Sequence, residues 1–219
     1  MAPLAHTLAL LAMAMATAAS DVMPLDMAPN YFDDQYRGCG PAMTVVLLAL
    51  NCSKFQKNPV FTLLWVKAAA EWRKRGFRVS PLSSPAQAIA VMAYSMKYMY
   101  RPFNDAVREA GSSPQEYRDN FYFKTLHFLL TQAQRTLRHA QNLQCRHMFW
   151  GVHDAQLKVW RRQRVRFGQF MLTSLSKEIA QKYGMDTIFQ VDMCHDLDIQ
   201  AFSSYHSYCE VLIPPYETF

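Results

Sequence analysis

Glycine is scarce in this chain, which has only seven glycines among 219 residues. Phosphate-binding loops of the P-loop and dinucleotide-binding types depend on clustered glycines, and neither pattern is present. The chain also has no Ser, His and Asp order typical of a hydrolase triad. These absences exclude the commonest nucleotide-binding loops and leave the function to be inferred from other residues.

Charged residues are also few, at 18% of the chain against 51% hydrophobic residues. A chain of this length and composition buries a substantial core, and we expect a single domain over residues 21–219. The net charge of +6 is concentrated between Lys158 and Arg166, where five basic residues fall within nine positions. This segment is either a patch for anionic glycans, phosphate or nucleic acid, or a solvated turn between two strands. We favour the turn and expect no nucleic-acid partner.

Long apolar stretches are confined to the N-terminus. Residues 1–20 form an apolar run that ends in small residues, which predicts a secretory signal peptide with a cleavage site near Ala19. The alternative is a buried N-terminal helix, because no Lys or Arg precedes the run. No later segment reaches the length of a membrane span, and the final residues PPYETF carry no hydrophobic tail for a lipid anchor. The sequence therefore predicts a secreted protein.

Cysteine is present in an odd number, five. In the oxidising secretory pathway these residues are expected to form disulfides rather than a metal site, and we predict no metal. Asn51 opens the sequon Asn51-Cys52-Ser53, which predicts glycosylation.

Helical patterns dominate the first two thirds of the chain. We predict helices over Ala42–Leu50 and Phe61–Arg75, and another that starts at Ser84-Pro85 and runs through Tyr100. The capping box at Ser113-Pro114-Gln115-Glu116 predicts a further helix that carries apolar residues at i, i+3, i+4 and i+7. That helical region holds two histidines, which we interpret as surface or hydrogen-bonded residues rather than metal ligands: His127 and His139.

From Cys145 onward the hydrophobic period changes to two. The segments MFWGV, VRFGQF, TIFQV and EVLIPP are predicted strands, and a short helix is expected within SLSKEIAQKYG. Helices followed by strands predict an α+β fold with a helical N-terminal half and a strand-rich core. Its few candidate functional groups are the carboxylate Glu210, the Thr173-Ser174 pair and Gln169.

Many ordered segments resemble the vertebrate ecto-ADP-ribosyltransferases over Asp26–Phe219, essentially the whole mature chain. They include DMAPNYFDDQYRGC, SPLSSPAQAIAVMAYSM, VRFGQF, FQVDMCHDLDIQAFSS and EVLIPPYETF. The resemblance implies an NAD-binding core and transfer of ADP-ribose from NAD to arginine side chains of extracellular or secretory-pathway proteins, with release of nicotinamide. NAD is then a substrate, and the expected localisation is extracellular.

The resemblance also implies roles for individual residues. Glu210 matches the catalytic glutamate, which stabilises the positive charge that builds on the ribose when the nicotinamide bond breaks. Four further residues match the NAD site: Gly151, Gln169, Thr173 and Ser174.

The cysteines follow the family as well. Cys145 and Cys194 match a disulfide between the two central strands. Cys39 matches a cysteine whose partner lies beyond Phe219, so either the sequence is truncated or Cys39 pairs with Cys52 or Cys209.

Three of four signature side chains depart from the family pattern. Trp150 stands where the family has an arginine that holds NAD phosphate. Leu172 replaces a serine that orients the glutamate, and Tyr208 replaces the glutamate that directs transfer to arginine. We therefore expect weak or absent arginine transfer, and two alternatives follow: a secreted binding or decoy domain, or an NAD glycohydrolase.

Overall fold

The computed structural model describes residues 21–46, 58–76, 81–141, 145–153, 155–194 and 197–219. The predicted signal peptide, Asn51 and Cys52 lie outside these residues. Within them the helices are α2 (Pro59–Arg75), α3 (Pro85–Ser95), α4 (Lys97–Ala110), α5 (Pro114–Asp119), α6 (Lys124–Ala140) and α7 (Lys177–Tyr183), with a 3₁₀ helix η1 (His206–Tyr208). The strands are β1 (Asp21–Pro24), β2 (Arg146–Val152), β3 (Ala155–Lys158), β4 (Met171–Ser174), β5 (Thr187–Met193), β6 (Leu197–Asp198) and β7 (Glu210–Ile213).

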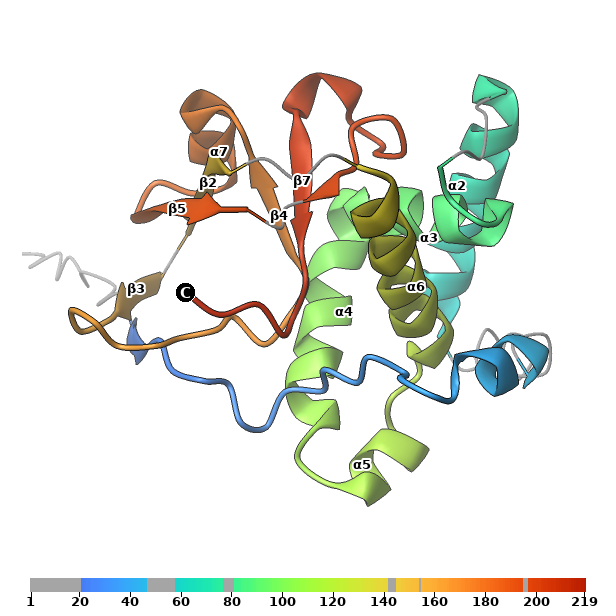
Figure 1. Cartoon of the computed structure of the whole chain (residues 1–219), viewed down its shortest axis with the longest axis horizontal. Helices are drawn as coiled ribbons and strands as arrows, with labels where there is room; N and C mark the ends of the chain where they lie inside the picture. The colour runs from blue at the N-terminus through green and yellow to red at the C-terminus, as the bar shows by residue number, and fades with distance from the viewer. Residues whose placement is uncertain (1–20, 47–57, 77–80, 142–144, 154, 195–196) are drawn as a thin grey trace, which may run out of the picture.

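Five strands form an antiparallel sheet in the order β5-β2-β4-β7-β6, and β1 pairs with β3 in a separate parallel ribbon. Figure 1 shows α2 to α6 grouped on one side of the molecule and the five-stranded sheet on the other, with α7 beside β2. The predicted α+β fold, with a helical N-terminal half and a strand-rich core, is confirmed.

Local capping explains where several helices begin. The side chain of Asn58 accepts from the Phe61 N–H at the start of α2, and Ser84 does the same for Gln87 at the start of α3. A proline at the first helical position follows both caps. The left-handed Gly76, at φ 62°, ends α2 just after Arg75.

Three predicted elements differ in the structure. The helix expected from Pro85 through Tyr100 is broken at Met96, whose extended backbone (ψ 134°) separates α3 from α4. The helix expected after Ser113 ends at Asp119, with Asn120 as its C-cap, and α6 starts separately at Lys124. Residues 40–46 are helical, whereas the rest of the predicted Ala42–Leu50 helix lies outside the described residues.

The predicted strand VRFGQF is also wrong. Arg166 forms only an isolated bridge with Thr218, and Gly168 takes a positive φ of 68° that turns the chain. The turn brings Phe170 into the main core and leaves Phe167 on the other side of the sheet.

Hydrophobic residues cover both faces of the sheet. The larger core joins the helices to one face through residues such as Leu172 and Leu212, each of which is buried. A smaller cluster on the other face contains Met148, Met171, Met193, Val211 and Ile213. Successive residues of β4 and β7 therefore project to opposite faces of the sheet, and this alternation decides the face to which each candidate site residue belongs.

Candidate active site

Glu210 is the first residue of β7 and its carboxylate is enclosed. The residue is 1% exposed. The hydroxyl of Tyr183 donates to Oε1 at 3.0 Å, and the hydroxyl of Ser203 donates to Oε2. Burial raises the pKa of Glu210 above its ordinary value, while the hydrogen bonds from Ser203 and Tyr183 act in the opposite direction. The structure therefore holds one carboxylate in a defined orientation through both of its oxygens.

Tyr183 reaches Glu210 because α7 lies directly on β2. A Cβ atom at Gly151 would stand 2.2 Å from the carbonyl oxygen of Ala180 and 2.3 Å from that of Gly184. Likewise, a Cβ atom at Gly184 would meet the backbone of Val152 at 2.1 Å. These backbone contacts require glycine at both positions, and they place the last residue of α7 over the start of β7.

Strand register brings part of the predicted site together. Phe149 pairs with Ser174, which in turn pairs with Glu210. The hydroxyl of Ser174 donates to the carbonyl oxygen of Tyr208 at 2.8 Å and accepts from the Ser176 N–H at 3.1 Å. Ser174 therefore holds the turn before Glu210 rather than the carboxylate itself.

The other predicted residues lie farther from the carboxylate. Thr173 projects to the opposite face, where its hydroxyl donates to the Val211 carbonyl oxygen at 3.2 Å. Gln169 precedes β4 at the strand end away from Ser174, and its side-chain oxygen accepts from Arg108 at 3.5 Å.

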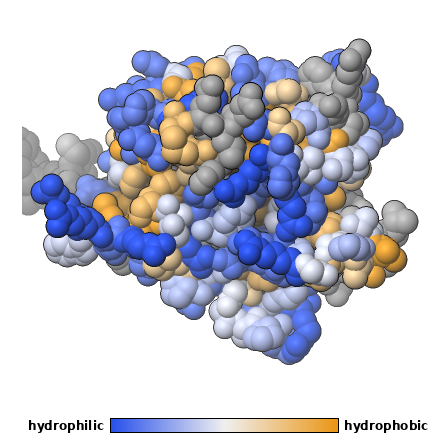
Figure 2. Space-filling model, viewed as in Figure 1, coloured by the Kyte–Doolittle hydropathy of each residue, from blue (hydrophilic) through white to orange (hydrophobic). Residues whose placement is uncertain are grey.

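The three departures from the family pattern have defined surroundings. Leu172 shares the face of Glu210 but is packed into the helical core, 8% exposed, with nothing to donate to a carboxylate. Trp150 projects from the opposite face, where its ring stacks on Phe189 (centroids 5.2 Å apart, 22° between planes) and meets the edge of Phe167. In Figure 2 hydrophobic residues gather over the region between β5 and β3, beside the C-terminus.

Tyr208 belongs to a cluster of three tyrosines next to Glu210. Its ring stacks on Tyr205, with centroids 5.1 Å apart, and stands at 81° to the ring of Tyr183. Lys182 Nζ lies 5.7 Å from the centre of the Tyr208 ring. An aromatic surface thus occupies the position where the family has a carboxylate for the acceptor.

Sequence reasoning missed Tyr183 and Ser203. Their only signals were the resemblance of SLSKEIAQKYG and DIQAFSS to the family, which did not assign a role to either hydroxyl. The described residues also contain no group of three or more His, Cys, Asp or Glu side chains arranged to hold a metal ion.

A disulfide joins Cys145, just before the start of β2, to Cys194, just after the end of β5. Because β5 is an edge strand, the bond clips one edge of the sheet and not two central strands. Cys39 and Cys209 are free thiols.

A cavity of about 240 Å³ lies beyond the other end of β7. Its lining contains none of the predicted site residues and consists of Gln35, Arg37, Thr131, Arg135, Arg138, His139 and Tyr216.

Among the helices that the structure describes, none has the length and apolar character needed to cross a membrane.

Comparison with solved structures shows the same fold. The mono-ADP-ribosyltransferase ART2.2 superposes with a TM-score of 0.80 at 32% identity, over 90% of this chain and 87% of that one. A variant of ART2.2 in complex with NAD gives a TM-score of 0.78 at the same identity and coverage.

Sequence comparisons agree. NAD(P)(+)--arginine ADP-ribosyltransferase 2 of Gallus gallus is 48% identical over 198 residues, covering 89% of this chain and 63% of its own length. GPI-linked NAD(P)(+)--arginine ADP-ribosyltransferase 1 of Homo sapiens is 40% identical over 216 residues, covering 91% of this chain and 66% of its own length. The chain thus spans about two thirds of the length of these relatives. The profile of the family described as NAD:arginine ADP-ribosyltransferase matches residues 25–219, and this chain belongs to that family.

Proposed function

We propose that this protein cleaves the nicotinamide–ribose bond of NAD and transfers ADP-ribose to the guanidinium group of protein arginine side chains. The observation that carries this proposal is the carboxylate of Glu210, held at the start of β7 by hydroxyl groups on both oxygens. Family membership supplies the reaction, and the name of the NAD-bound ART2.2 variant supports NAD as the substrate.

Glu210 has the chemistry that this reaction needs. When the bond between the ribose carbon and nicotinamide breaks, nicotinamide leaves with the bonding electrons and the ribose carbon becomes positively charged. A fixed carboxylate stabilises that charge as it forms, without reorganising. A guanidinium nitrogen of the acceptor then bonds to the ribose carbon and loses a proton. If water attacks instead, the products are ADP-ribose and nicotinamide, as in a glycohydrolase.

Hydrolysis is the second candidate function, and the environment of Tyr208 favours it. Its ring packs against Tyr205 and supplies no negative charge to attract a guanidinium. We expect arginine transfer to be slower than in relatives that carry a glutamate there, while the ribose chemistry at Glu210 is retained. A binding or decoy domain is the third candidate, favoured by the loss of the arginine at Trp150.

We place this activity in the extracellular space or the secretory pathway, with arginine-bearing proteins there as acceptors. Support comes from the apolar residues 1–20 and the Asn51 sequon, which predict export, and from names of relatives that include "GPI-linked" and "Ecto". We propose residues 21–219 as one domain that follows the signal peptide.

The test mixes purified protein with labelled NAD and agmatine, a small guanidine acceptor, and follows nicotinamide and ADP-ribosyl-agmatine by mass spectrometry. Glu210→Ala should abolish both products, while Glu109→Ala, at an exposed glutamate on α4, should leave both unchanged. Nicotinamide release without the adduct would assign the protein as a glycohydrolase. If wild-type protein forms neither product above the Glu210→Ala level, the proposed reaction is wrong and a binding role replaces it.

A further inference from the structure

The hydroxyl of Ser203 has a fixed direction. The residue is fully buried, and its oxygen accepts the Tyr205 N–H at 2.9 Å while its proton points to Oε2 of Glu210. Because an ionised carboxylate can only accept hydrogen bonds, Ser203 must be the donor. With one hydrogen bond donated to Glu210 and one accepted from Tyr205, the hydroxyl has a fixed orientation toward Glu210.

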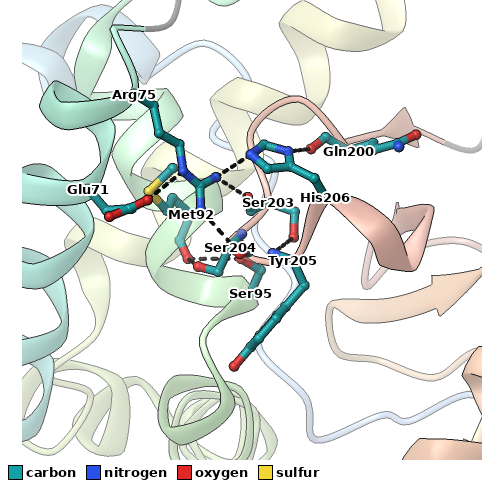
Figure 3. A network of polar contacts seen from close by, with 9 residues as sticks. All are labelled: Glu71, Arg75, Met92, Ser95, Gln200, Ser203, Ser204, Tyr205 and His206. Atoms are coloured by element: carbon teal, nitrogen blue, oxygen red, sulfur yellow. Dashed lines mark hydrogen bonds and ion pairs between the residues drawn. The ribbon is translucent and has the colours of Figure 1, made fainter.

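The backbone that carries Ser203 is clamped between two helices. Arg75, at the end of α2, donates from Nη1 to the Ser203 carbonyl oxygen at 2.8 Å and from Nη2 to that of Ser204 at 3.2 Å. From α3, the hydroxyl of Ser95 accepts the Ser204 N–H at 2.8 Å. The Ser204 hydroxyl in turn donates to the Met92 carbonyl oxygen at 2.9 Å. Figure 3 shows the guanidinium of Arg75 directed at this segment, with Met92 and Ser95 also beside it.

Arg75 is itself held in place. Its Nε donates to the carboxylate of Glu71, one turn earlier on α2, at 2.7 Å, and its side chain is only 17% exposed. Its Nη1 also donates to Nε2 of His206, whose Nδ1 donates to the Gln200 carbonyl oxygen. A planar guanidinium with several donors suits such a site, because it bonds four acceptors at once.

Leu172 cannot orient Glu210, and Ser203 can. It lies on the face of Glu210 where the family resemblance places a serine that orients the glutamate, and it cannot donate a hydrogen bond. Ser203 reaches the same carboxylate from the loop between β6 and β7. We propose that Ser203 and Arg75 are positioning residues for Glu210: Ser203 replaces the missing serine as donor, and Arg75 fixes the segment that presents it. This inference rests on the proposed function.

The matched variants are available in the chain. Ser203→Ala removes the donor, Ser203→Thr retains it, and Ser207→Ala makes the same change at an exposed serine of the same loop. Arg75→Ala removes the hydrogen bonds that hold the Ser203 segment. Arg73→Ala is its control on the same helix, where the exposed Arg73 side chain donates to the Ala69 carbonyl oxygen.

The first readout is NAD cleavage over a range of pH. Loss of a hydrogen bond to a charged group predicts that Ser203→Ala lowers kcat about 10–100-fold with little change in KM. The acid limb of the pH-rate profile of Ser203→Ala should move to higher pH, because the lost bond had favoured the ionised carboxylate. Arg75→Ala should lower kcat and shift the acid limb in the same directions, each by a smaller amount. Ser203→Thr should stay within about threefold of wild type, and Ser207→Ala and Arg73→Ala should match it.

The second readout needs no activity. ¹³C-glutamate labelling with NMR titrates the carboxylate of Glu210, assigned by its loss in Glu210→Gln. A pKa that rises in Ser203→Ala and Arg75→Ala but not in the controls supports the inference, even if wild-type protein cleaves no NAD and the proposed function fails. An unchanged pKa in a folded Ser203→Ala protein, or equal loss in Ser203→Thr, overturns it.

Discussion

The rings of Tyr205 and Tyr208 lie nearly parallel, 14° apart, with their centroids separated by 5.1 Å. Tyr208 stands two residues before Glu210, at the position that the family resemblance assigns to a glutamate for the arginine acceptor. A stacked aromatic pair is apolar on its faces, so the acceptor side of this site differs in charge from that of the family pattern.

Replacing Tyr208 by glutamate should therefore favour transfer over hydrolysis. A carboxylate there can accept charge-assisted hydrogen bonds from a guanidinium, which predicts a rise of about 10–100-fold in the ratio of ADP-ribosyl-agmatine to free ADP-ribose. Mass spectrometry of both products measures the ratio. Tyr98→Glu, at a tyrosine 70% exposed on α4, is the control. An unchanged ratio would show that this position does not select the acceptor.

Trp150→Arg tests the phosphate contact. The new guanidinium is expected to lower the KM for NAD about tenfold or more, at the expense of the stacking of Trp150 on Phe189. Steady-state kinetics and a thermal melt separate the two effects. Trp160→Arg adds the same charge at a tryptophan 65% exposed, and it should leave KM unchanged. A KM that falls equally in both variants would mean that general positive charge is responsible.

Tyr183→Phe removes the other hydrogen bond to Glu210. That bond lowers the carboxylate pKa, so without it the pKa rises further above its ordinary value. Since the ionised form performs the chemistry, the acid limb of kcat/KM should move to higher pH. A pH-rate profile of NAD cleavage checks this. Tyr205→Phe is the control, because the donors to Glu210 are Tyr183 and Ser203. A shift of equal size in that variant would contradict the prediction.

His127 predicts a pH dependence of stability. Burial lowers its pKa to about 3, and it is uncharged, with Nε2 donating to the Phe32 carbonyl oxygen and Nδ1 accepting from the Tyr36 hydroxyl. The unfolded chain binds a proton below about pH 6.5, whereas the folded protein does not until about pH 3. His127 should therefore make stability fall as pH drops through this window, by up to about 1.4 kcal/mol per pH unit.

Denaturant unfolding at pH 7, 5.5 and 4.5 measures this effect. His127→Gln should lose stability at pH 7 yet show a shallower decline toward pH 4.5 than wild-type protein. His139→Gln, at an exposed histidine of the same helix, should retain the wild-type slope. Parallel pH curves for wild type and His127→Gln would contradict the assignment.

Features set by neighbouring residues were predictable from the sequence. The caps at Ser84 and Ser113 and the αL residue Gly76 act within one helical turn, and each lies where its local pattern indicates. The break at Met96 has no such signal, because its side chain makes no capping hydrogen bond. VRFGQF alternates like a strand, but the positive φ of Gly168 turns it.

The site was predictable only in part. Resemblance to the family pointed to Glu210, and β7 begins there. Tyr183 and Ser203 meet that carboxylate only after α7 docks on β2 and the loop before η1 folds back between α2 and α3. Such contacts depend on tertiary packing, so they cannot be predicted from the spacing of residues in the sequence.

The close approach of Gly151 and Gly184 makes the spacing between helix and sheet part of the chemistry. With a methyl group at either position, α7 would have to lift from β2, since the nearest backbone atoms stand 2.2 Å or less from the added carbon. Tyr183 would be carried away with the helix, and one oxygen of Glu210 would lose its donor. Gly151 and Gly184 thereby set the distance at which the Tyr183 hydroxyl can reach Glu210.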